Sequence, residues 1–134
     1  MVAGAVFSGT AAVYYWLPKW CGRMYDETMG KLQFWIAFIA FNITFMPQHF
    51  LGLAGMPRRY SDYGLQFADW NMVSSIGAFM YGGAQLLFLY NVIRTIGWGK
   101  PIDDPQVWEG AEGLEWTLPT PAPFHTFSTP PIVK

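Results

Sequence analysis

Three long stretches of the chain contain no Asp, Glu, Lys or Arg, and each of them is mostly apolar. They cover residues 1–18, 32–57 and 70–93. A helix needs about 20 mostly apolar residues to cross a bilayer, so stretches of this length predict membrane-spanning segments. Their most apolar parts predict three transmembrane helices, over about residues 2–17, 32–50 and 72–96. The first of these is short for a complete crossing.

Tryptophans and prolines mark the expected ends of these helices. Trp16, Trp35 and Trp98 stand where a membrane–water interface is expected, which is a typical place for tryptophan. Proline lacks the amide hydrogen that a helix interior uses. We therefore expect Pro18 to disfavour continuation of the first helix, and Pro47 to bend or end the second.

The composition changes after Trp98. Most of the prolines and five of the nine acidic residues lie in residues 99–134, where no long apolar run occurs. Such a segment buries too little apolar surface to fold by itself. We therefore predict a transmembrane region over residues 1–98 and an extended, Pro-rich tail over residues 99–134 that lies along a partner surface.

The overall composition agrees with a membrane protein and disfavours several other classes. Only 13% of the 134 residues are charged and 52% are hydrophobic, with a net charge of −1. Soluble domains carry about 25% charged residues. Disorder and a basic nucleic-acid-binding domain are disfavoured, and the single cysteine, Cys21, excludes an internal disulfide. The mean hydropathy of +0.19 is low for a membrane protein because the tail is polar.

Basic residues outside the helices predict the orientation of the chain. Five lie in or beside the first connector or near the end of the third helix, and only Arg58 and Arg59 lie in the second connector. The side with more Lys and Arg is expected to be the inner side of the membrane. The first connector and the tail are then inner, and the arginine pair is outer. The five inner basic residues are Lys19, Arg23, Lys31, Arg94 and Lys100.

Arg58 and Arg59 are the sharpest chemical signal in the sequence. Two adjacent guanidinium groups beside a membrane require anions, and each can bind a carboxylate or a phosphate through two hydrogen bonds. One interpretation is a lipid headgroup contact, or ion pairs with Asp62 and Asp69. The other is an anionic cofactor or substrate held at the outer end of a helix bundle, where Gly52 and Gly55 would let the backbone approach it closely.

The other chemically active residues form no recognisable catalytic or metal site. His49 and His125 are far apart in the sequence, and Cys21 is the only thiol. These are too few and too dispersed for a metal site made by this chain alone. No nucleophile has histidine and acid partners in its sequence context, and no phosphate-binding glycine loop occurs. We therefore predict no catalytic residue and no metal ligand in this chain.

The run at residues 41–63, FNITFMPQHFLGLAGMPRRYSDY, resembles cytochrome c oxidase subunit I and is long and specific to that family. The similarity extends to GAVF at 4–7, WN at 70–71, SS at 74–75, LEW at 114–116 and PAPFHTF at 121–127. It covers nearly the whole chain but only the C-terminal quarter or so of that subunit. The resemblance implies an all-α membrane protein that is part of the twelve-helix haem–copper oxidase bundle. The parts represented would be the end of helix ten, helices eleven and twelve, and the extended C-terminal tail.

The resemblance also implies roles for individual residues. Arg58 and Arg59 match the arginine pair that binds the haem propionates on the outer side. Phe45 and Gln48 match positions beside the low-spin haem. The chain departs from the family at Gly64-Leu65, where Pro-Asp is common, and at Ser128, where the family has Glu.

The function implied by the resemblance is reduction of oxygen to water coupled to proton pumping. The low-spin and high-spin haems would be shared with the N-terminal part of subunit I, because the family's histidine ligands lie upstream of Met1. Copper would be bound by that partner, and this chain would not be catalytic in isolation. Other expected partners are subunits II, III and accessory subunits, membrane lipids, and cytochrome c as electron donor, without nucleic acid. The implied location is the mitochondrial inner membrane, with a bacterial plasma membrane as the alternative.

Three hypotheses remain open from the sequence. The first is a naturally split subunit I, of which this chain is the C-terminal piece. The second is a structural or assembly module derived from subunit I that binds no haem. The third is a fragment of a conventional single-chain subunit.

Overall fold

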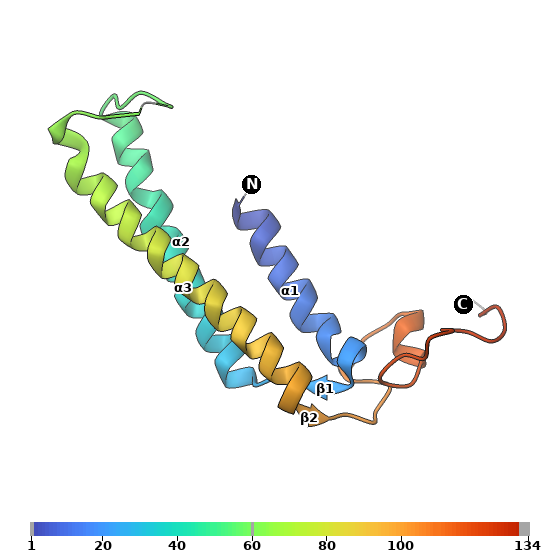
Figure 1. Cartoon of the computed structure of the whole chain (residues 1–134). Helices are drawn as coiled ribbons and strands as arrows, with labels where there is room; N and C mark the ends of the chain where they lie inside the picture. Colours follow the sequence, from blue (N-terminus) through green and yellow to red (C-terminus); the bar gives the residue numbers. More distant parts are fainter. Residues whose placement is uncertain (1, 60, 132–134) are drawn as a thin grey trace. The chain divides into compact units, whose positions relative to one another are not determined.

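The computed structural model of the chain describes residues 2–59 and 61–131 and is mostly helical (Figure 1). Tyr60, within the run at residues 41–63, and residues 132–134 of the predicted tail lie outside the described residues. The elements in chain order are α1 (Val2–Cys21), β1 (Arg23–Met24), α2 (Glu27–Leu53), η1 (Leu65–Phe67), α3 (Ala68–Trp98), β2 (Lys100–Pro101) and η2 (Leu114–Thr117). The chain forms two compact units, Glu27–Tyr90 and Met1–Asp26 with Asn91–Lys134, and each is described by itself.

Within the described residues, two helical segments are long and apolar enough to cross a membrane. They are Glu27–Leu53 and Leu65–Trp98, each with a mean hydropathy of 1.4 over its most apolar window. Only 28% and 17% of these windows are buried, whereas the core helix of a soluble protein is mostly covered. Large apolar side chains such as Phe79, 83% exposed, lie on the outside. The second and third predicted spans thus coincide with helices of the transmembrane type.

The first predicted span is also helical, but it is not among the described segments that pass the same test of length and hydropathy. Tyrosine, proline and lysine residues in its last turns lower its mean hydropathy. A membrane crossing by α1 therefore stays a prediction.

Two of the helices continue through a proline. α1 extends past Pro18 to Cys21, although a proline disfavours such a continuation. The helix can continue because Pro18 lacks only its own amide hydrogen. The carbonyl oxygen of Pro18 still accepts a hydrogen bond from the amide of Gly22 at 2.8 Å. α2 likewise does not end at Pro47, which is buried in its interior.

Helices α2 and α3 run side by side, and small residues allow them to approach closely (Figure 1). A Cβ atom added to Gly77 would lie 2.6 Å from the backbone nitrogen of Thr44, so only glycine fits there. The Ser74 hydroxyl donates to the Thr44 carbonyl oxygen at 2.7 Å. Ala40 and Ala84 are fully buried in the same unit. Small side chains at such a contact let the two helix backbones approach closely, and the closest approach lies at Gly77.

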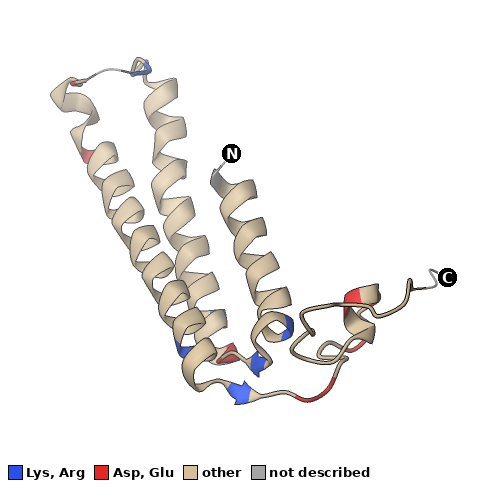
Figure 2. Cartoon of the chain, turned by 45° about the vertical axis from the view of Figure 1, so that its right-hand side comes forward, with Lys and Arg blue, Asp and Glu red and all other residues tan. Residues whose placement is uncertain are grey.

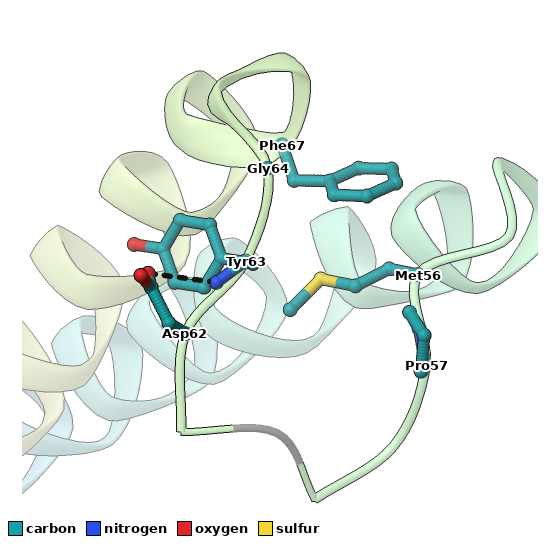
Figure 3. A pocket seen from close by; sticks show the side chains of 6 residues that line it. All are labelled: Met56, Pro57, Asp62, Tyr63, Gly64 and Phe67. Atoms are coloured by element: carbon teal, nitrogen blue, oxygen red, sulfur yellow. Dashed lines mark hydrogen bonds between the residues drawn. The ribbon is translucent and has the colours of Figure 1, made fainter.

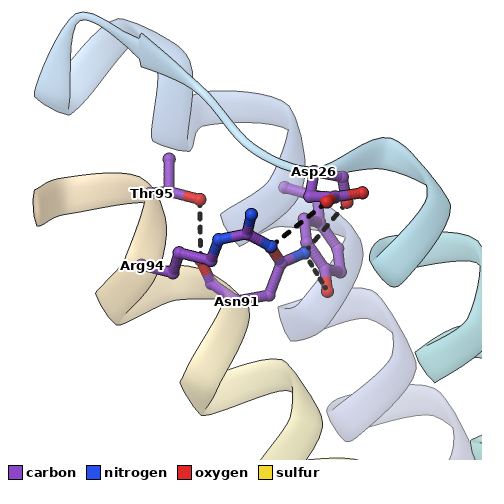
Figure 4. A network of polar contacts seen from close by, with 5 residues as sticks. Asp26, Asn91, Arg94 and Thr95 are labelled. Atoms are coloured by element: carbon purple, nitrogen blue, oxygen red, sulfur yellow. Dashed lines mark hydrogen bonds and ion pairs between the residues drawn. The ribbon is translucent and has the colours of Figure 1, made fainter. Parts of the chain in front are cut away.

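A network of polar contacts joins α1, the first connector and the last turns of α3 (Figure 4). Asn91 is fully buried, and its side-chain nitrogen donates to the Asp26 carbonyl oxygen at 3.2 Å and lies 3.5 Å from the Tyr14 hydroxyl. The Thr95 hydroxyl donates to the Asn91 carbonyl oxygen at 2.6 Å. Arg94 and Asp26 form an ion pair at 3.2 Å. A buried amide with these partners fixes the connector against two helices.

The tail packs partly against its own chain, which was not expected. β1 and β2 form a short antiparallel pair in which Arg23 opposes Pro101 and Met24 opposes Lys100. Further along the tail, Trp116 is only 3% exposed and its ring lies 5.1 Å from that of Tyr15 in α1. The short helix η2 and the burial of Trp116 were not predicted, because the composition of the tail as a whole gives no sign of one buried tryptophan.

Lys19 holds this part of the tail. It lies just beyond the predicted span 2–17, and it is 3% exposed. Its ammonium donates to the carbonyl oxygens of Leu118 at 2.5 Å and Pro105 at 3.2 Å, and to the Thr120 hydroxyl at 3.2 Å. It also lies 5.5 Å from the centre of the Trp116 ring. Burial lowers the pKa of Lys19 below its ordinary value, and the charge of Glu115 opposes this effect.

Candidate functional site: the arginine turn after α2

The end of α2 is built by a glycine that directs the chain into the arginine turn, Met56–Arg59. Gly55 has a φ of +85°, a conformation that glycine adopts without steric cost. The amide of Met56 donates to the Leu51 carbonyl oxygen at 3.0 Å, and that of Gly55 to the Gly52 carbonyl oxygen at 3.1 Å. This pair of bonds is the Schellman arrangement that ends many helices. It fixes where the chain leaves α2, three residues before Arg58.

Arg58 and Arg59 are both exposed in this turn. Arg59 has a φ of +62°, which is uncommon for a residue other than glycine and occurs often at functional sites. The ion pairs of the described residues join Lys31 to Glu27 and Arg94 to Asp26, and neither involves the arginine turn. The expected alternative of ion pairs between the arginines and Asp62 or Asp69 is therefore not seen in the described part of the chain.

Charge along the α2–α3 unit is confined to the ends of its helices. Figure 2 shows the long middle of both helices without coloured residues, and charged residues at the connector between them. Arg58 and Arg59 follow the C-terminus of α2, where the helix dipole is negative, and Asp69 stands in the first turn of α3, where it is positive. Both placements are electrostatically favourable, and they leave the guanidinium groups able to bind a further anion.

A shallow pocket of about 460 Å³ lies in the same connector (Figure 3). The Asp62 carboxylate accepts a hydrogen bond from the backbone amide of Tyr63 at 2.8 Å and so keeps its place beside the pocket. The Met56 sulfur lies 3.6 Å from the side-chain nitrogen of Asn71 in α3. The pocket is lined by Met56, Pro57, Asp62, Tyr63, Gly64 and Phe67. The pocket is therefore lined by residues that precede the arginine pair and by residues that follow it. The sequence alone did not indicate that these two segments lie close together.

Phe45 and Gln48 lie further back on α2. Phe45 is half-buried, and its ring packs 4.7 Å from that of Phe41. The Gln48 side-chain nitrogen donates to the Ser74 hydroxyl of α3 at 3.2 Å. Among the described residues, the hydrogen bond of Gln48 and the ring contact of Phe45 are made with α2 and α3 and not with the arginine turn. Ser74 was not singled out as a partner of Gln48, because a helix pairing must be known before its register can be read.

His49 and Cys21 each contact a backbone carbonyl oxygen one turn earlier in their own helix. His49 Nδ1 lies 3.0 Å from the carbonyl oxygen of Phe45, one turn earlier in the same helix. The Cys21 thiol donates to the Leu17 carbonyl oxygen at 3.1 Å. Within residues 2–59 and 61–131, no three His, Cys, Asp or Glu side chains are grouped so that they could hold a metal ion.

The fold and the site define an all-α membrane protein with an exposed arginine pair suited to anions. The family profile of cytochrome c and quinol oxidase polypeptide I matches residues 1–80, and the chain belongs to this family. It is 49% identical over 132 residues to cytochrome c oxidase subunit 1 of Cereibacter sphaeroides, covering 98% of this chain and 23% of that protein. It is 44% identical over 131 residues to putative cytochrome c oxidase subunit 1-beta of Streptomyces avermitilis, covering 96% and 23%.

The chain thus spans about a quarter of the length of the curated relatives it matches. Its resemblance to subunit I of this oxidase, inferred from the run at residues 41–63, is confirmed by these matches. Both of these relatives are bacterial.

Proposed function

We propose that the chain is the C-terminal part of the catalytic subunit of a cytochrome c oxidase and that Arg58 and Arg59 bind haem propionates. The observation that carries this proposal is the arginine pair itself, exposed after α2 and without an ion pair in the described chain. When bound, the haems supply the electron transfer and oxygen reduction, and the whole subunit couples this reaction to proton pumping.

The residues present fit such a group. Two guanidinium groups supply two positive charges for carboxylates, and each can donate two parallel hydrogen bonds. Gly55 sets the exit of the chain from α2, so the arginines start from a defined backbone position. Fixed positive charge beside a propionate favours its ionised form. The same charge favours an added electron on a nearby redox centre, which raises its reduction potential.

Phe45 and Gln48 are proposed to contact the low-spin haem. Phe45 offers the apolar face of a half-buried ring, which suits a flat macrocycle. Gln48 uses its side-chain nitrogen for Ser74, and this bond would fix the direction in which its oxygen points. We propose this pair as positioning groups and assign the charge interaction to the arginines.

The remaining parts come from partners. The rest of subunit I, on the same polypeptide or on a separate one, would supply the histidine ligands to the haems and to copper. Subunits II, III and accessory subunits, lipids, and cytochrome c as electron donor complete the proposed assembly. We propose the mitochondrial inner membrane as its location, with a bacterial plasma membrane as the alternative. Fractionation of the source cells distinguishes the two locations.

The test of this proposal compares charge-neutral variants in the purified membrane complex. We expect Arg58→Gln and Arg59→Gln to lower the haem reduction potentials by an amount on the order of tens of millivolts and to lower oxidase activity, because one positive charge is lost beside the haem. Lys31→Gln removes a charge from an exposed ion pair at the start of α2 and is the matched control. Unchanged haem potentials in both arginine variants would contradict the binding of the haem propionates by Arg58 and Arg59.

A further inference from the structure

The tail contains an exposed segment that the proposed function does not use. Residues 119–127, PTPAPFHTF, form what we call the proline strip. Every residue from 121 to 131 is exposed. Phe124 is 97% exposed, and its ring makes an edge contact with the neighbouring His125 at 5.1 Å. A phenylalanine left this open is costly in water, so it marks a surface for contact with another molecule.

The start of the proline strip is firmly attached to the chain. Thr120 is 8% exposed, and its hydroxyl accepts a hydrogen bond from Lys19 at 3.2 Å. Pro121 lies against Gly22, where an added Cβ would be 2.8 Å from the Pro121 Cδ atom. The strip therefore leaves the folded part from a fixed point. A segment held in this way loses less conformational entropy on binding than a free tail does.

The backbone of the strip limits how it can be recognised. Pro119, Pro121 and Pro123 lack amide hydrogens, so the strip cannot pair with a sheet edge at these alternate positions or continue as a helix. Proline-rich segments of this kind bind instead through their side chains in apolar grooves. Phe124 is the most exposed large apolar side chain of the strip and is therefore available for such a groove.

The charge of the tail indicates the chemistry of the partner. The chain has no Lys or Arg between Pro101 and Val133. An anionic membrane surface would repel this segment, whereas a basic protein surface would attract it. We propose that the proline strip docks on another polypeptide of the membrane complex, in an apolar groove that receives Phe124 and is bordered by basic residues. Five exposed carboxylates supply the charge: Asp103, Asp104, Glu109, Glu112 and Glu115.

The first test is photo-cross-linking in the intact complex. Phe124 is replaced by p-benzoylphenylalanine, the membranes are irradiated, and the complex is purified through a tag on this chain. We expect one cross-linked polypeptide in constant ratio to the chain, with the linked peptide flanked by Lys or Arg. Cross-links to lipid only, links within this chain only, or no cross-link would overturn the proposal.

The second test measures retention of that polypeptide during purification. Phe124→Ala is expected to weaken its retention about tenfold, because one buried aromatic contact is lost. Thr126→Ala changes an exposed neighbour in the same strip and is the matched control. Glu112→Gln is expected to reduce the salt dependence of retention. Equal retention in the Phe124→Ala and Thr126→Ala complexes would contradict the docking of Phe124.

These tests do not depend on haem. A cross-linked partner in a complex without haem absorbance would support the docking while contradicting the proposed propionate site. A haem-containing complex without a cross-link would contradict the docking of the proline strip and would leave the proposed propionate site supported.

Discussion

Gly77 faces the backbone of α2 at Thr44, and this contact depends on the absence of a side chain. We expect Gly77→Ala to destabilise the packing of α2 on α3 by about 1–3 kcal/mol, the usual cost of overpacking a tight contact. The added Cβ would meet backbone atoms of Thr44 and Ile43, which cannot move aside as a flexible side chain can. Thermal denaturation of the purified complex measures the effect.

Gly82 provides the control for this prediction. It lies in the same helix, but a Cβ added there would have open space around it. We expect Gly82→Ala to leave thermal stability unchanged or slightly raised, because alanine favours a helix over glycine. An equal loss of stability in both variants would show that helix propensity, and not the contact with Thr44, governs the result.

Lys19 is the second residue whose burial makes a clear prediction. In Lys19→Met the carbonyl oxygens of Leu118 and Pro105 lose a charged donor. Hydrogen bonds to charged groups contribute about 1.5–3 kcal/mol each, so the tail around η2 should open more often. Limited proteolysis should then cut residues 105–120 faster than in the unaltered chain. Lys31→Met, at an exposed lysine, should not change the cleavage rate.

At the scale of elements, the end of α2 determines where the arginine turn begins. Gly55→Ala forces a side chain into a left-handed conformation at a cost of about 1 kcal/mol. We expect this variant to lower stability and to shift the haem potentials in the same direction as neutralisation of an arginine, since the turn is displaced. Redox titration of the purified complex measures the shift.

Gly52→Ala is the matched variant for this helix end. Gly52 lies inside α2, and a Cβ there would have open space around it. We expect unchanged potentials in Gly52→Ala. A shift of equal size in both variants would show that the conformation of Gly55 is not what positions the arginines.

Helices were predicted correctly from the sequence where a local pattern of residues determines them. Long charge-free runs predicted α2 and α3, because a membrane-type helix must be apolar over its whole length. The extension of α1 past Pro18 was not predicted, since one missing amide is tolerated when the following bonds are made. The burial of Trp116 was also missed. It depends on Lys19 and Tyr15, about a hundred residues earlier, and no local pattern reveals such contacts.

The candidate site could be predicted only in part for the same reason. Arg58 and Arg59 stood out because adjacent charges beside an apolar run need anions. The bond between Gln48 and Ser74, and the pocket that brings Met56 near Phe67, depend on how α2 pairs with α3. Sequence spacing within one helix gives no information on that register.

At the scale of the whole molecule, the proposed function makes the chain a part of a larger assembly. It spans about a quarter of the length of its relatives. Its two apolar helices have most of their surface exposed, and its arginine turn has no carboxylate partner in the described residues. Lipid and the rest of subunit I would cover the helices, a haem would neutralise the arginines, and a neighbouring polypeptide would receive the proline strip.

The most direct test of the central claim is purification of the chain from its native membrane, followed by a reduced-minus-oxidised visible spectrum of each fraction. The proposed function predicts that the chain elutes with haem absorbance at a constant ratio across the peak. Elution of the chain in fractions without haem absorbance would contradict it.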